Sequence, residues 1–440
     1  MDNPIISKNR ELIKEQLKIN DFALNAVEGE INRLDNLSLN LRHPLFFYAL
    51  LAILTNILFP LAGLKRMVKS KGDDFIFVSC TDSYFRTKSI GLITSQLKYC
   101  IIYLPTFHVP CAFQYHKYFK KNGTRVFFPT IKLRHVISAK YKVRNLTRMM
   151  QGLGKDFESR KVICIVTQYL IYDGLVKDYL SQVESFKGKW ILEHQKFFFI
   201  PSVTNLQERG VKSTMLQHTV FFKPHYDFIP LICDDVLCCS DRERSIYINS
   251  GVEPDRVITL GASLQNLETD DELKAQTGRR TYNLLLALSI IDEKTIDLTK
   301  SILSFIKQQQ YEKVMIRFRP RSRNNDIELL KDYITGFDYS PSSSTLTEDI
   351  EKCDKVITFS ANANFEIMRM KRQFIYVRFD KEQGFVRDLG CVTEDNYQEE
   401  IRKLMESDTY STFGEEKYKE VFGETDVEVL RQRFVSYIKG

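Results

Sequence analysis

Short apolar runs alternate with helical segments over most of the chain from Asp74 onward. The runs are rich in Val, Ile and Phe, whereas the segments between them, such as IPSVTNLQERG, have helical composition. In chain order the runs are FIFVSC, YCIIYLP, TRVFFPT, KVICIVTQ, KWILEH, STMLQH, DDVLCCS and DRVITLGA. This alternation predicts a parallel β-sheet with helices on both faces. We therefore expect a first Rossmann-like α/β domain over residues 74–262.

The alternation restarts after a polar stretch at residues 263–280, which we interpret as a linker. Strand-like YNLLLALS, KVMIRFRP, DKVITFS and FIYVRFD then alternate with helical segments. Residues 281–395 therefore predict a second Rossmann-like α/β domain, and residues 396–440 have a helical pattern. A chain of 440 residues with 43% hydrophobic content is long enough to bury two such cores.

The first 73 residues contain the longest apolar run of the chain. No residue is charged from Pro44 to Leu64, and basic residues flank this run on both sides. About 20 apolar residues are enough to cross a bilayer, although Asn56 and Pro60 interrupt the second half. A transmembrane span, an interfacial helix and a buried helix of the first domain are all open interpretations. We expect residues 1–73 to form a helical segment that associates with the cytoplasmic face of the plasma or inner membrane.

Charge, cysteines and motifs exclude several functions. The net charge of +7 suits anionic partners such as nucleotide phosphates but is too diffuse to indicate nucleic-acid binding. The nine cysteines form no C-x-x-C pair and no zinc-ligand spacing, so we expect buried free thiols in a reducing compartment. The motifs of P-loop enzymes, dinucleotide oxidoreductases and serine hydrolases are absent.

Two predicted strands end in groups that can transfer protons. Ligands of parallel sheets bind at the carboxyl ends of the strands, where Glu193 follows KWIL and His218 follows STMLQ. A histidine such as His218 needs no large pKa shift to act as a base near neutral pH, and the aromatic run after Glu193 provides apolar surroundings that suit a general base. Either residue could instead be structural, and the sequence does not decide between them. His225 and Asp227, in the following loop, are weaker candidates, which would contact the substrate that gives up the proton (the acceptor).

A turn in the second domain predicts a phosphate site. The segment DKVITFSANANFEIM runs from a strand through a turn into a helix, so Ser360, Asn362 and Asn364 lie at a helix N-terminus. Backbone N–H groups and the helix dipole bind phosphate oxygens there. Glu366, further along the helix, is a candidate acceptor for ribose hydroxyls. An ordinary helix cap at Ser360 or Asn362 is the structural alternative.

Arginines provide the charge that a phosphate needs. Arg317, Arg319, Arg321 and Arg323 alternate around the end of KVMIRFRP, so in an extended strand they share one face. We expect Arg317 and above all Arg319 to bind phosphate, with a solvated basic strand end as the alternative. No Asp-x-Asp pair occurs in a suitable loop, so we predict that the reaction uses no metal and no cofactor.

These segments resemble parts of the bacterial capsule and teichoic-acid transferases, polysialyltransferase-like enzymes included. DKVITFSANANFEIM is similar to their strand–Ser–helix element, and KVMIRFRPRSR is similar to their strand that ends in His-Pro or Arg-Pro. ERGVKSTMLQHTVF resembles their Gly-Ile-x-Thr…Gln-His-Gly segment, with Thr219 where glycine is usual. The resemblance covers roughly residues 189–380. It implies the GT-B architecture, in which two Rossmann-like domains face each other across a cleft.

The resemblance also implies an activity. It implies a glycosyltransferase that moves a sugar from a nucleotide-sugar donor to a bacterial surface glycan, such as capsule or lipopolysaccharide, or to a lipid-linked acceptor at a membrane. Such transfer needs a base, charge to stabilise the leaving phosphate, and exclusion of water. A nucleotide-sugar 2-epimerase-like enzyme of the same fold and a non-catalytic binding protein of the envelope pathway are the alternatives. The sequence does not decide among CMP, CDP and UDP as the donor nucleotide.

Overall fold

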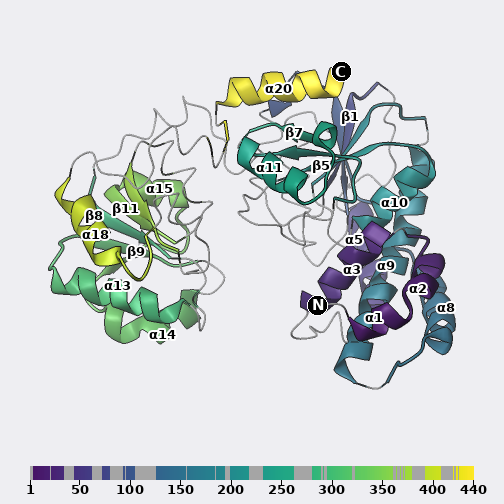
Figure 1. Ribbon diagram of the computed structural model, residues 1–440, viewed down its shortest axis with the longest axis horizontal. Coiled ribbons are helices and arrows are strands. Elements are labelled where there is room, and N and C mark those ends of the chain that lie inside the picture. The colour runs from purple at the N-terminus through teal and green to yellow at the C-terminus, as the bar shows by residue number, and fades with distance from the viewer. Residues whose placement is uncertain are drawn as a thin grey trace. The chain divides into compact units, whose positions relative to one another are not determined.

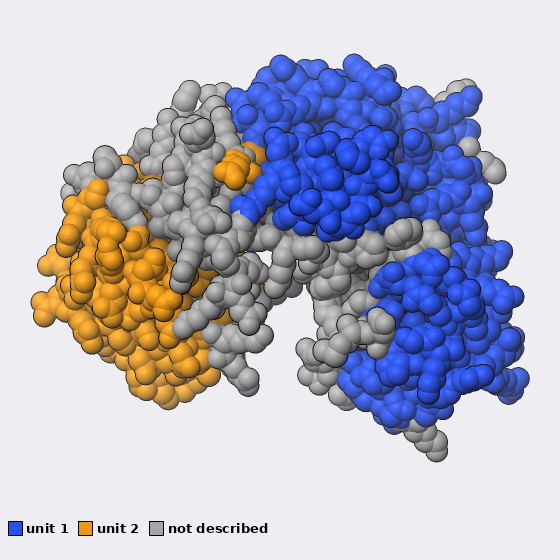
Figure 2. Space-filling view, viewed as in Figure 1, with its two compact units in different colours: residues 1–264, 424–440 blue, residues 265–423 orange. Residues whose placement is uncertain are grey.

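The chain folds into two compact units, each built on one parallel sheet (Figures 1 and 2). The first unit comprises Met1–Leu264 and Glu424–Gly440, and the second comprises Gln265–Gly423. The computed structural model describes residues 3–19, 21–33, 44–61, 72–79, 93–94, 96–104, 125–154, 156–183, 185–193, 199–217, 231–261, 280–288, 291, 295–319, 323–359, 363, 367, 370, 372–378, 392–407, 420, 423–424 and 426–440.

Seven parallel strands form the sheet of the first unit. Their order is β3-β2-β1-β4-β5-β6-β7. Their bounds are Arg125–Phe127 (β3), Tyr99–Tyr103 (β2), Phe75–Ser79 (β1), Lys189–Leu192 (β4), Ser213–Leu216 (β5), Asp235–Cys238 (β6) and Val257–Thr259 (β7). All five residues of β1 are buried, as expected for a strand with helices on both faces. The strand order reverses between β1 and β4, which places the switch point of the sheet there.

The long helix α9 (Phe157–Gln182) lies at the centre of the helices on one side of this unit. It contacts α1 (Pro4–Lys8), α3 (Asp21–Arg33), α5 (Pro44–Leu61), α8 (Leu133–Met149) and α10 (Ile200–Glu208) (Figure 1). The run KVICIVTQ, predicted as a strand, lies inside α9, so that prediction was wrong. A helix that is buried almost all round has no polar stripe, and its apolar run therefore lacks the helical period that would identify it.

The N-terminal helices are part of the first hydrophobic core. Ile6 of α1, Leu17 of α2 (Arg10–Leu17) and Leu24 of α3 are buried in the same cluster as the inner faces of the sheet and α9. One face of α5 joins this cluster through Tyr48 and Leu51. The apolar run thus forms a helix with one face in the first core and large apolar side chains exposed on the other, so it is not the fully buried helix that was one of the three interpretations. Among the described residues, no helix has both the length and the apolar character needed to cross a membrane.

The second unit repeats the strand order of the first. Its parallel strands run in the order β10-β9-β8-β11-β12, with the switch point between β8 and β11. Their bounds are Asp338–Tyr339 (β10), Val314–Arg317 (β9), Tyr282–Ala287 (β8), Cys353–Thr358 (β11) and Gln373–Tyr376 (β12). Helices α13 (Ile296–Gln308), α14 (Arg323–Ile334), α15 (Leu346–Glu351) and α18 (Tyr397–Glu406) accompany them. The prediction of two parallel α/β sheets is therefore confirmed.

The last helix, α20 (Val427–Lys439), returns to the first unit. The ring of Phe434 packs edge-on against Phe75, with 5.5 Å between the ring centroids. The Tyr437 hydroxyl donates to Asp235 at 3.2 Å, and the Lys189 ammonium lies 4.0 Å from the centroid of the Tyr437 ring. Phe75, Lys189 and Asp235 each open a strand, so α20 lies across the amino-terminal ends of β1, β4 and β6. The opposite, carboxyl edge of the sheet carries the predicted base.

Candidate functional site

A buried carboxylate lies at the switch point of the first sheet. Glu193 directly follows β4, and Ser79 ends the adjacent strand β1. The Ser79 hydroxyl donates to Glu193 Oε2 at 2.7 Å, and the Glu193 backbone N–H donates to the Val78 carbonyl at 3.0 Å. Glu193 is 3% exposed and Ser79 is 1% exposed. The structure therefore holds one predicted base in a defined orientation at the edge where parallel sheets bind ligands.

Further polar groups lie at the ends of the neighbouring strands. Gln217 follows β5, and its Oε1 accepts a hydrogen bond from the Tyr247 hydroxyl at 3.1 Å. Burial, and then the nearby Glu243 carboxylate, raise the pKa of Tyr247 well above its ordinary value, so this hydroxyl stays protonated and donates. The side chain of Gln217 is thus held in place directly before residue 218.

A helix begins shortly after β6, and its N-terminal cap was not predicted from the sequence. Ser240 caps α11 (Asp241–Asn249) by accepting from the Glu243 N–H at 3.3 Å. Glu243 in turn accepts from the Cys239 N–H at 3.0 Å through Oε2. Both Ser240 and Glu243 are buried. The Ser-x-x-Glu spacing was the signal for this cap, and it gives Glu243 a structural role.

Arg317 of the second unit is committed to a buried ion pair. Its Nη1 pairs with Asp349 of α15, and it also donates to the Ser344 carbonyl at 3.1 Å and the Ser340 hydroxyl at 3.2 Å. The Asp349 side chain is fully buried, and that of Arg317 is 15% exposed. These bonds tie the segment after β10 to the carboxyl end of β9. Binding of phosphate by Arg317 stays a prediction.

Arg319 lies two residues beyond the end of β9 and is exposed. Among the described residues it has no hydrogen-bond or ion-pair partner. Thr358 ends β11 at the second switch point, opposite Ala287 of β8, and the predicted phosphate turn follows it in the chain. The other predicted site residues lie outside the described residues: His218, His225, Asp227, Ser360, Asn362, Asn364 and Glu366.

A further cation at the carboxyl edge of this sheet, Arg378, was not predicted. Arg378 follows β12, and its Nη1 donates to the Tyr376 hydroxyl at 2.8 Å. The guanidinium carbon also lies 5.7 Å from the centroid of the Tyr376 ring. The sequence FIYVRF contained this arginine, but a strand pattern alone did not separate it from the other basic residues of the chain.

The described cysteines are free and buried, in agreement with the prediction. Burial raises the pKa of Cys164 to about 11 and that of Cys233 to about 12. Such thiols remain protonated at neutral pH and are poor nucleophiles. Within the described ranges, no three His, Cys, Asp or Glu side chains gather in a way that could hold a metal ion.

Comparisons with known proteins show the fold. No protein-family model matches the chain, and no curated protein matches it. The UDP-GlcNAc 2-epimerase from Methanocaldococcus jannaschii has a TM-score of 0.52 at 11% identity, covering 82% of this chain and 99% of that chain. A mutant of S. aureus TarM in complex with Fondaparinux, alpha-GlcNAc-glycerol and UDP has a TM-score of 0.51 at 10% identity, covering 83% and 100%.

A third solved structure gives the same result. The UDP-N-acetylglucosamine 2-epimerase from Rickettsia bellii has a TM-score of 0.50 at 12% identity, covering 85% of this chain and 98% of that chain. The three likenesses extend over both units, because each covers more than four-fifths of the chain. This chain therefore has the GT-B fold that the sequence resemblance implied. At such low identity the likeness establishes the fold and leaves the reaction to be argued from the site.

Proposed function

We propose that this protein is a glycosyltransferase that moves a sugar from a nucleotide-sugar donor to a surface glycan or lipid-linked acceptor. The observation that carries the proposal is the Ser79–Glu193 pair, a buried carboxylate oriented by a hydroxyl at the switch point of the first sheet. The GT-B fold supports nucleotide-sugar chemistry, since the proteins that share it here include a TarM mutant solved with Fondaparinux, alpha-GlcNAc-glycerol and UDP.

In the proposed reaction Glu193 is the general base. An acceptor hydroxyl attacks the anomeric carbon, the bond from that carbon to the donor phosphate breaks, and Glu193 takes the hydroxyl proton. The hydrogen bond from Ser79 holds the Glu193 carboxylate in one orientation before the acceptor binds, so little entropy is lost in positioning the base for the reaction. His218 is the alternative base, with His225 and Asp227 proposed to contact the acceptor.

The second unit is proposed to bind the donor. Arg319 would neutralise the leaving phosphate, because it is an exposed cation next to the carboxyl edge of the sheet. The turn with Ser360, Asn362 and Asn364 would supply hydrogen-bond donors, and Glu366 would accept from the ribose. Since arginine and backbone donors can carry this charge, we propose that transfer needs no metal.

A nucleotide-sugar 2-epimerase is the second candidate. It is favoured by the likeness to the M. jannaschii UDP-GlcNAc 2-epimerase, almost all of which is covered by this chain. A non-catalytic binding protein of the envelope pathway is a weaker candidate, because a binding protein has no need for an oriented buried carboxylate at this edge.

The test uses the full chain with CMP-, CDP- and UDP-sugars, with and without a glycan acceptor. For a transferase, Glu193→Gln should lower acceptor-dependent transfer by about 100-fold or more while thermal stabilisation by the nucleotide is retained. Glu208→Gln, which changes an exposed carboxylate of the same unit, should leave both unchanged. Interconversion of sugar isomers without an acceptor would establish the epimerase instead. Wild-type transfer by Glu193→Gln would refute Glu193 as the base.

A further inference from the structure

Two neighbouring helices of the first unit expose large apolar side chains. On α8 these are Leu133, Ile137 and Tyr141, which are spaced four residues apart and so form one stripe. On α5 they are Phe46, Leu50, Ile53 and Leu54, again on one side of the helix. These seven side chains are between 43% and 73% exposed, and the two helices contact each other. We call them the α5–α8 face.

The charge of this face has a single sign. The α8 sequence contains no acidic residue, and α5 contains no charged residue at all. Lys140, Arg144 and Arg148 fall in the same arc of about 100° as the apolar stripe of α8, given 3.6 residues per turn. All three are exposed, and none has an acidic partner among the described residues. Apolar and cationic side chains therefore alternate on the exposed side of α8, next to the exposed apolar side chains of α5.

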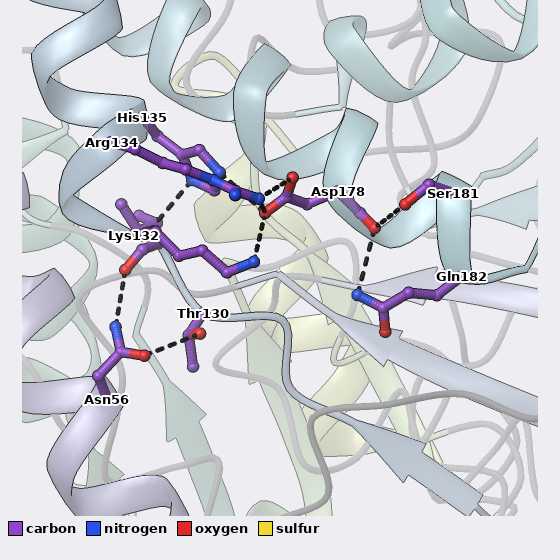
Figure 3. A network of polar contacts seen from close by, with 9 residues as sticks. Asn56, Thr130, Lys132, Arg134, His135, Asp178, Ser181 and Gln182 are labelled. Atoms are coloured by element: carbon purple, nitrogen blue, oxygen red, sulfur yellow. Dashed lines mark hydrogen bonds and ion pairs between the residues drawn. The ribbon is translucent and has the colours of Figure 1, made fainter.

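A network of polar contacts holds α8 against α9 and α5 (Figure 3). Asp178 of α9 accepts from Lys132 Nζ at 2.7 Å and from Arg134 Nη2 at 2.6 Å, and its Oδ2 lies 3.0 Å from His135 Nε2. Burial tends to raise the pKa of Asp178, but the bonds from Arg134 and Lys132 lower it to about 2. Asn56 of α5 donates to the Ile131 carbonyl at 3.0 Å, just before α8. The apolar side chains are thus exposed on firmly attached helices.

We infer that the α5–α8 face binds the surface of a membrane that contains anionic lipids. Apolar side chains of a helix lying in the interface enter the acyl boundary, while neighbouring lysines and arginines contact the headgroups. Phe46, Leu50 and Ile137 would supply the buried area, and Lys140 and Arg144 the attraction. The inference goes beyond the proposed reaction and does not depend on it, although it would bring a lipid-linked acceptor to the first unit.

Other occupants fit this face less well. A second copy that docked the same face by two-fold symmetry would bring the basic α8 against its own equivalent, with no acidic side chain from either helix between them. Nucleic acid would satisfy the cations but would leave the aliphatic side chains of α5 without apolar contacts. An anionic bilayer satisfies both.

The test is sedimentation of the full chain with vesicles. We expect binding to vesicles of equimolar phosphatidylcholine and phosphatidylglycerol, little binding to phosphatidylcholine alone, and weaker binding as salt is raised. Each cation near such a surface is worth about fivefold in affinity, so Lys140→Glu with Arg144→Glu should weaken binding by about 20-fold or more. Ile137→Ser should also weaken binding, because it removes apolar contact area.

A matched control distinguishes an effect of this face on vesicle binding from an effect of the net charge of the protein. Lys212→Glu with Lys307→Glu makes the same change in net charge at two exposed lysines on other elements, and it should leave vesicle binding unchanged. Equal losses in both double variants, or no binding of the wild type to anionic vesicles, would overturn the inference. Self-association that Ile137→Ser abolishes, without any vesicle binding, would assign the face to a second copy instead. Transfer to a soluble acceptor should survive in all these variants, so a failure here is distinct from a failure of the proposed reaction.

Discussion

Replacing Asp349 by alanine should destabilise the second unit and leave the first unit unchanged. The carboxylate is fully buried and accepts hydrogen bonds from Arg317 and from the Ser344 hydroxyl, the latter at 2.7 Å. Its removal leaves a largely buried guanidinium without a counter-charge and a hydroxyl without its acceptor. Breaking a buried ion pair from one side costs about 3–5 kcal/mol. We therefore expect a loss of about 4 kcal/mol in the free energy of unfolding of this unit.

The chain carries its own reporter for the assay. Its single tryptophan, Trp190, lies buried in β4 of the first unit, so tryptophan fluorescence follows that unit, while circular dichroism follows the helices of both. With a urea m-value of about 2 kcal/mol/M, a loss of about 4 kcal/mol lowers the midpoint of the second unit by about 2 M. In Asp349→Ala the dichroism should change at lower urea, and the fluorescence midpoint should not move.

Two further variants decide how the result is interpreted. Asp332→Ala, which removes an exposed carboxylate on α14, should shift neither midpoint. Arg317→Met combined with Asp349→Leu replaces the pair by apolar groups and should recover most of the stability. A loss below about 1 kcal/mol in Asp349→Ala, or an equal shift of the fluorescence midpoint, would refute the reasoning. If the double variant is still stabilised by nucleotide, Arg317 acts through the fold; if that stabilisation is lost, Arg317 binds phosphate.

The remaining predictions concern the first unit and the reaction. A Cβ at Gly174 would lie 3.2 Å from the His135 ring, so Gly174→Ala should loosen α8 on α9 and lower the fluorescence-detected stability by about 1–2 kcal/mol; an unchanged midpoint would contradict this packing. The Asp178 carboxyl has a folded pKa of about 2 against an ordinary value of 3.8, so its stabilisation is complete above about pH 5 and is lost as the pH falls toward 2; Asp178→Asn should flatten that part of the pH profile. Gly261 has φ +127°, and a Cβ there would lie 2.3 Å from Leu430 Cδ2, so Gly261→Ala should displace α20 and increase proteolysis of the C-terminus, whereas unchanged cleavage would mean that α20 tolerates it. Chelation by EDTA should leave transfer unchanged, and loss of activity that Mg²⁺ restores would refute metal-independent transfer.

Most strands could be predicted from sequence because they are short apolar runs between breakers, whereas the exposed two-residue strand β10 has no such run and was not predicted. FIFVS and STML, for example, form β1 and β5. KVICIVTQ met the same criterion but belongs to α9, since burial on all sides removes the periodicity that distinguishes a helix from a strand. The N-terminal helices showed only weak periodicity, and their place in the core depends on contacts with α9 that lie far along the chain. Local pattern thus predicts elements better than it predicts their partners.

The same limit applies to the site. Glu193 was identifiable because it directly follows an apolar strand, but its partner Ser79 lies 114 residues earlier and reaches it only because β1 and β4 are neighbours. Similarly, the alternating arginines were expected to share one face of an extended strand, with Arg319 as the main phosphate ligand. The strand ends at Arg317, after which Arg319 is exposed and Arg323 begins α14, donating to the Ser340 carbonyl at 2.6 Å. Their different roles follow from where the strand stops.

The two sheets share one strand order, so each unit has a switch point at the carboxyl edge of its own sheet. In each sheet the order reverses between the first strand and the fourth, which are β1 and β4 in one unit and β8 and β11 in the other. Helices then leave the sheet on opposite sides, which opens the carboxyl edge at that point to a ligand. Glu193 follows β4, and the predicted phosphate turn follows β11. Topology as well as residue type therefore marks both positions as ligand sites. If Glu193→Gln loses transfer but still binds the nucleotide, the first unit supplies the base and the second unit binds the donor.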